Sequence, residues 1–69
     1  MLESSPNGQL DKVDRVILAA LQDDGRVSNA ELARRIGLSA PAVHARIRRL
    51  EEDGYIRRYA AILDPERLG

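Results

Sequence analysis

The chain has 69 residues, of which 43% are hydrophobic and 32% are charged, and it contains eleven basic side chains, eleven acidic side chains and no cysteine. A chain this short holds one domain at most, and such a domain buries only about 60% of the surface that its unfolded form exposes. Without cysteine, neither disulfides nor cysteine-bound zinc can add stability. The core therefore has to come from aliphatic side chains, and the simplest compartment is a reducing cytoplasm.

Composition also argues against membrane insertion and catalysis. The longest uninterrupted apolar stretch, Val16 to Leu21, is far shorter than the roughly 20 residues that cross a bilayer, and no signal peptide opens the chain. There is one histidine, and the acidic residues are scattered, so no nucleophile with a base, glycine-rich phosphate loop or metal-ligand cluster is recognisable. We expect a cytoplasmic protein that is not an enzyme and uses no cofactor or metal.

The formal net charge of zero conceals an uneven distribution along the chain. Residues 1–24 carry two basic and five acidic side chains, a balance of −3, and residues 51–69 carry three arginines and five acids, a balance of −2. Residues 25–50 carry six arginines and one glutamate, a balance of +5. A basic middle between two acidic ends favours an anionic partner for the middle of the domain.

The chain opens with residues 1–9, whose Ser, Pro, Asn and Gly content predicts a flexible arm. A first helix is predicted from about Lys12 to Gln22, because Asp11 and Asp14 have the spacing of a capping box and Leu10 stands where a staple residue would pack. Helical spacing gives this helix one apolar face, formed by Val13, Ile17, Ala20 and Leu21.

A second, short helix is predicted between Ser28 and Gly37. Ser28 and Glu31 have the capping-box spacing, in which the hydroxyl accepts from the Glu31 N–H and the Glu31 side chain reaches back to the cap. Gly37 ends the helix because glycine readily adopts the left-handed conformation. The residues expected to face the core are Leu32, Ala33 and Ile36.

A third helix is predicted from Ala40 to Asp53, with Ser39 as its N-cap. Pro41 is tolerated there because the first turn has no internal partner for the missing N–H. Gly54 closes the helix. The segment from Tyr55 to Leu63 reads YIRRYAAIL, in which aromatic and branched residues partly alternate with arginine, as in a strand or wing.

Two helices joined by a short turn that contains glycine, with a first helix packed behind them, form a helix-turn-helix. We therefore predict a mainly α, three-helix domain of the winged-helix type over residues 10–54, followed by a wing or hinge strand within residues 55–69. A helical wheel of the third helix places Val43, Ile47 and Leu50 on the core side. The outer side carries Pro41, His44, Ala45 and Arg48, and Arg46 and Arg49 flank it.

This outer side has the residue types that a DNA major groove requires. Small side chains at its N-terminal end let the backbone approach base edges, and Arg48 can read a guanine in bidentate fashion, worth about 1–3 kcal/mol of discrimination. Arg46 and Arg49 are expected to position the helix on phosphates. Ser28 and Ser39, with the N–H groups at their helix N-termini, are natural phosphate contacts.

A solvated helix face is the alternative interpretation. Arginine-rich faces are usually exposed to water, and the acids of residues 51–53 have the spacing to pair with Arg48 and Arg49. His44 alone is an ordinary surface residue. The capping box, the Gly37 turn, the small outer residues and the local charge of +5 agree with one another, and this agreement favours DNA binding.

Residues 10–69 contain the pieces LDKVDRVIL, DGRVSNAELARRIGLS, VHARIRRLEEDGYI and YAAILDPERLG. Together they resemble the N-terminal DNA-binding region of the Lrp/AsnC, or feast/famine, transcriptional regulators. The resemblance implies a winged-helix-type domain whose third helix enters the major groove of double-stranded DNA. It also implies a hinge strand that leads to an α/β domain, outside these residues, which binds amino acids and assembles homo-oligomers. The DNA contacts that it implies are Ser39, Pro41, His44, Arg46, Arg48 and Arg49, with Ser28 and Asn29 near the backbone.

Two other functions remain open at this point. The chain can be a protein-interaction or dimerisation module that uses its apolar first helix and the edge of YIRRYAAIL. It can also be an architectural DNA binder that recognises shape rather than sequence.

Overall fold

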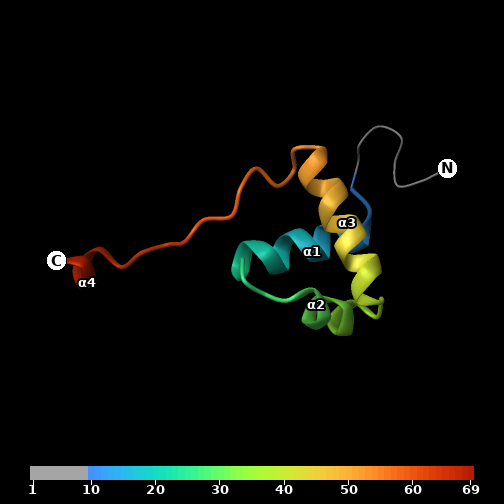
Figure 1. Cartoon of the computed structure of the whole chain (residues 1–69), viewed down its shortest axis with the longest axis horizontal. Helices are drawn as coiled ribbons and strands as arrows, with labels where there is room; N and C mark the ends of the chain where they lie inside the picture. Colours follow the sequence, from blue (N-terminus) through green and yellow to red (C-terminus); the bar gives the residue numbers. More distant parts are fainter. Residues whose placement is uncertain (1–9) are drawn as a thin grey trace.

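The computed structural model describes residues 10–69, so the arm predicted at residues 1–9 lies outside the described part. Three helices pack together, and an extended segment leads away from them to a fourth, short helix (Figure 1). The helices are α1 (Lys12–Asp23), α2 (Asn29–Ile36), α3 (Ala40–Glu52) and α4 (Pro65–Leu68).

The predicted capping box at the start of α1 is confirmed. The Asp14 N–H donates to Asp11 Oδ1 at 2.8 Å, and the Asp11 N–H donates to Asp14 Oδ2 at 3.3 Å. Two backbone donors that a helix N-terminus leaves without a partner are thereby satisfied.

The second predicted capping box is only half formed. Ser28 Oγ accepts from the Glu31 N–H at 3.0 Å, as expected. The Glu31 carboxylate, however, does not reach back to the cap but binds Arg34 and, at 2.8 Å, Arg35 Nε. A guanidinium is a stronger partner for a carboxylate than a neutral N–H is, so two arginines one turn away compete successfully with the cap.

Glycine ends α2 and follows α3 in the left-handed conformation. Gly37 has φ of 87°, and its N–H donates to the Ala33 carbonyl at 2.8 Å. Ser39 then caps α3, its Oγ accepting from the Ala42 N–H at 3.2 Å. These contacts confirm the predicted turn and fix the direction in which α3 leaves α2.

The core lies where α1, α2 and α3 meet. Ile17, Leu32 and Val43, one from each helix, are completely buried. Burying each such side chain contributes about 1.5–3 kcal/mol relative to exposure. The full buried apolar set is Ile17, Leu32, Ala33, Val43, Ile47 and Leu50.

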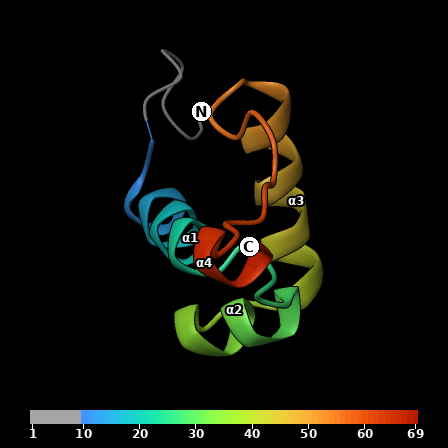
Figure 2. The same cartoon turned by 90° about the vertical axis from the view of Figure 1, so that its left-hand side faces the viewer.

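The strand predicted from Tyr55 to Leu63 is not formed within residues 10–69. This segment is extended, and all of its residues except the partly buried Ile56 are exposed, Ile62 to 99%. A strand requires a neighbouring strand to accept and donate its hydrogen bonds, and the described residues supply none. Figure 2, which looks from the C-terminal side, shows α1 and α3 with α2 below them and α4 in front.

Candidate nucleic-acid interface

The outer face of α3 is exposed as the helical wheel predicts. Pro41, His44, Ala45 and Arg48 are all exposed, whereas Val43, Ile47 and Leu50 on the opposite side are buried. Pro41 and Ala45 are small side chains on either side of His44 in the N-terminal half of this face. The α3 backbone can therefore come close to a flat or grooved partner.

The start of α2 and the outer face of α3 form one continuous surface. Asn29, the first residue of α2, places its Nδ2 atom 3.4 Å from Nδ1 of His44. Ser28 and Ser39, the two N-caps, are exposed. The structure thus brings together one residue from the start of α2 and one from α3, which are 15 positions apart in the sequence.

Arg48 has a weak partner within the chain. Its Nη2 atom lies 3.9 Å from Glu52 Oε2, and the two side chains are 60% and 67% exposed. An exposed pair at this spacing contributes about 0.3–0.5 kcal/mol, so the guanidinium can leave it at little cost. The ion pair between Arg48 and an acid of residues 51–53, which the solvated-face interpretation predicts, is therefore present, but it is too weak to keep Arg48 from binding another partner. Arg49 is also exposed, in the last turn of α3.

Arg46 does not join this surface. Its Nη1 atom donates to Asp11 Oδ2 at 2.6 Å and to Asp14 Oδ1 at 3.1 Å, and its side chain is only 29% exposed. The helical wheel already indicates this position, because residues four positions apart, such as Arg46 and Leu50, lie only about 40° from each other around the helix. Arg46 is therefore next to the buried Leu50. The sequence analysis does not predict its ion pairs with Asp11 and Asp14.

These contacts change the electrostatics at the start of α1. The hydrogen bond from Arg46 is the main cause that lowers the pKa of Asp11 below its ordinary value of 3.8, and the hydrogen bond from the Asp14 N–H adds to it. The pKa of Arg46 is raised, chiefly by the same hydrogen bond to Asp11. Both side chains are thus held in their charged forms at neutral pH.

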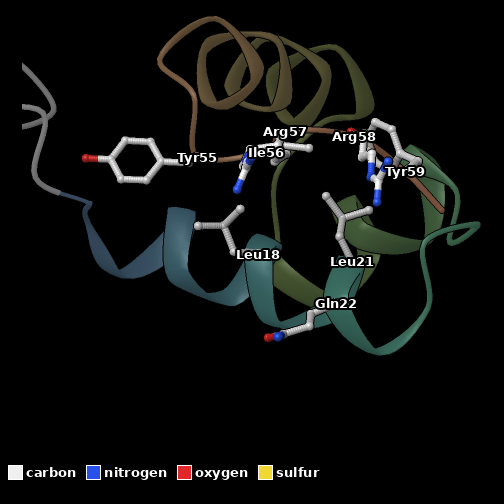
Figure 3. A pocket seen from close by; sticks show the side chains of 8 residues that line it. All are labelled: Leu18, Leu21, Gln22, Tyr55, Ile56, Arg57, Arg58 and Tyr59. Atoms are coloured by element: carbon white, nitrogen blue, oxygen red, sulfur yellow. The ribbon is translucent and has the colours of Figure 1, made fainter.

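A hollow of about 390 Å³ lies between α1 and the segment that follows α3. Figure 3 shows Leu18 and Leu21 rising from α1 toward Ile56 and Tyr59. Tyr59 is anchored separately, since its hydroxyl donates to Glu51 of α3 at 2.9 Å. Its pKa is raised above 10.0, first by burial and then by the hydrogen bond to this carboxylate.

In the described residues, no three His, Cys, Asp or Glu side chains gather as metal ligands. Across the same part of the chain, every helix is too short or too polar to span a bilayer. The arrangement instead has two helices joined by a glycine turn, a supporting helix behind them, and an exposed face with small and basic residues. These features define a helix-turn-helix domain.

Comparison with known proteins agrees with this class. The sequence pattern of the winged helix-turn-helix DNA-binding family matches residues 10–57. The leucine-responsive regulatory protein of Rhizobium meliloti is 54% identical over 61 residues, which are 88% of this chain and 39% of that protein. The protein of the same name from Escherichia coli is 51% identical over 63 residues, which are 91% of this chain and 38% of that protein.

Solved structures give the same result. Bacillus subtilis LrpC superposes with a TM-score of 0.80 at 43% identity, over 88% of this chain and 44% of that one. A Neisseria meningitidis transcriptional regulator in complex with L-Met gives 0.83 at 45% identity, over 87% of this chain and 39% of that one. The chain therefore belongs to the winged helix-turn-helix DNA-binding family and, within it, to the Lrp/AsnC transcriptional regulators. It spans about two-fifths of the length of the curated relatives described above.

Proposed function

We propose that this chain binds double-stranded DNA with sequence preference, by placing α3 in the major groove, and that it is the operator-reading part of a transcriptional regulator. The observation that carries the proposal is the outer face of α3. It is exposed along its length, and it presents His44 and Arg48 beside the small side chains of Pro41 and Ala45, while the opposite face is buried. Membership of a DNA-binding family supports the same function.

The contacts divide into base readers and phosphate contacts. Arg48 and His44 lie on the outer face one turn apart and are proposed to read base edges. The phosphate contacts are proposed to be Ser28, Asn29, Ser39 and Arg49, which lie at the helix N-termini or at the end of α3. Pro41 is proposed to permit close approach. Arg46 is not proposed as a DNA contact, because its guanidinium binds two carboxylates.

A domain of this size is proposed to act in pairs within a longer protein. Helix-turn-helix proteins commonly bind two half-sites about one helical turn, roughly 34 Å, apart, so this chain alone should bind weakly. The relatives are more than twice as long, and the Neisseria regulator was solved with L-Met. We propose a cytoplasmic homo-oligomer whose amino-acid effector binds a further domain.

The test is a selection of DNA sequences by this chain from a random pool, followed by titration of the selected duplex and a shuffled duplex at two salt concentrations. A sequence preference and a steep loss of affinity with salt support the proposal, because each neutralised phosphate releases counterions. Equal displacement by unrelated DNA would instead identify an architectural binder.

A protein-interaction module remains the second candidate, because large apolar side chains are exposed after α3. Tyr59 is 50%, Leu63 64% and Ile62 99% exposed, and exposed apolar patches commonly mark interfaces. Concentration-dependent dimerisation, measured by analytical ultracentrifugation, without DNA affinity at low salt would favour this candidate.

A further inference from the structure

The capping box of α1 also binds the proposed recognition helix. Each of its two carboxylates uses one oxygen for the cap and the other for Arg46. Asp11 accepts from the Asp14 N–H through Oδ1 and from Arg46 through Oδ2. Asp14 accepts from the Asp11 N–H through Oδ2 and from Arg46 through Oδ1. All four carboxylate oxygens are therefore used.

Arg46 connects parts of the chain that are far apart in sequence. It lies 35 residues from Asp11 and 32 residues from Asp14. Asp14 is only 6% exposed and is the buried charged residue of the described chain. A carboxylate at this depth requires a cationic or hydrogen-bonding partner, and Arg46 supplies one.

The contacts of α3 within the core are apolar, and outside the core His44 lies 3.4 Å from Asn29 of α2. Val43, Ile47 and Leu50 hold the helix against α1 and α2, but apolar contact is not directional. Charge-assisted hydrogen bonds are directional and short. Arg46 Nη1 donates two such hydrogen bonds, one to Asp11 and one to Asp14. Together they constrain the rotation of α3 about its own axis and its position along α1.

We propose that Arg46 is a positioning residue. By binding the capping box of α1, it sets the orientation in which α3 presents His44 and Arg48, and it does not contact phosphate. This inference rests on the proposed DNA binding. It separates Arg46 from Arg48 and Arg49, its neighbours in the RIRR run.

The test compares three variants of the 69-residue chain, Arg46→Met, Asp11→Asn and the double variant, with Arg15→Met as a matched control. Arg15 is an exposed arginine of α1, so its replacement makes the same change in charge. Asparagine is as good an N-cap as aspartate, so Asp11→Asn keeps the cap of α1 and removes one of the two negative charges that bind Arg46. Circular dichroism first establishes that each variant is folded at the temperature used.

Affinities are measured by fluorescence anisotropy for a duplex that the unaltered chain selects from a random pool and for a shuffled duplex, over a salt series. Arg46→Met should lower the preference for the selected duplex about tenfold, the size of one base contact, with the slope of log K against log salt unchanged. Asp11→Asn should lower the preference in the same direction, although the loss of a negative charge by itself favours DNA binding. The double variant should be no worse than Arg46→Met, because the two residues act as one pair.

Two results would overturn the inference. If Arg46→Met weakens both duplexes equally and lowers the salt slope by about 0.9, Arg46 contacts a phosphate. If the folded variants keep the full preference while their melting temperatures fall, the ion pair serves stability alone. Arg15→Met should leave the preference unchanged.

An NMR titration of the Asp11 carboxyl group separates this inference from the proposed function. In Arg46→Met the pKa of Asp11 should return toward its ordinary value of 3.8, whether or not DNA is bound. An unchanged pKa would contradict the ion pair itself. If the unaltered chain shows no preference for any duplex, the proposed function and the positioning role both fail, while the titration still decides whether the ion pair exists.

Discussion

Replacing Arg48 with alanine should remove the preference for one base pair while leaving the fold intact. Arg48 is 60% exposed, and its pair with Glu52 spans 3.9 Å, so its loss should change the free energy of unfolding by no more than about 0.5 kcal/mol. A bidentate contact to guanine contributes about 1–3 kcal/mol of discrimination. At about 1.36 kcal/mol per tenfold, the variant should lose roughly 5- to 150-fold in preference at one position of the site.

The assay is an anisotropy titration of the selected duplex and of duplexes in which each base pair is replaced in turn. Arg67→Ala is the matched control, because Arg67 is an exposed arginine of α4, at the far end of the extended segment (Figure 1). Arg49→Ala should weaken binding to all duplexes alike. Identical behaviour of Arg48→Ala and Arg49→Ala would refute the division into a base reader and a phosphate contact.

Further predictions concern the fold and its ionisation. Gly37→Ala should lower the free energy of unfolding, measured by urea denaturation, by about 1–2 kcal/mol. The cause is the φ angle of 87°, which is strained for alanine, and not a steric clash, because open space surrounds the new Cβ. Leu32→Ala, in a completely buried site, should cost about 2–5 kcal/mol by the same method. Asp11 has a lowered pKa, so its stabilising effect is complete above pH 3.8 and is lost as the pH falls through the lower folded value. Asp11→Asn should therefore flatten acid denaturation in that range. Glu51→Gln should bring the pKa of Tyr59 closer to 10.0 in a spectrophotometric titration.

Local signals in the sequence located the three packed helices well. The first helix was predicted to end at Gln22 and ends at Asp23, and the third was predicted to end at Asp53, which is its C-cap. Capping residues and the Gly37 turn act over three or four positions, so they can be read directly from the order of residues. The core side of α3 follows from helical periodicity in the same way.

Contacts between distant residues could not be read in this way. The helical wheel places Arg46 at the flank of the outer face, where we expect a phosphate contact, but a wheel does not show which acids another helix brings to its side. The predicted hydrogen bond from the Ser28 N–H to the Glu31 carboxylate is not formed for a related reason. Arg34 and Arg35 bind this carboxylate instead. The strand at Tyr55 to Leu63 depends on a partner strand that residues 10–69 do not contain.

The central claim is that the outer face of α3 reads DNA sequence, and its most direct test is the titration of this chain with its selected duplex and a shuffled duplex at two salt concentrations. We expect tighter binding to the selected duplex at both concentrations and a loss of affinity for both duplexes as salt rises. Equal affinity for the two duplexes, or no binding at low salt, would contradict the claim.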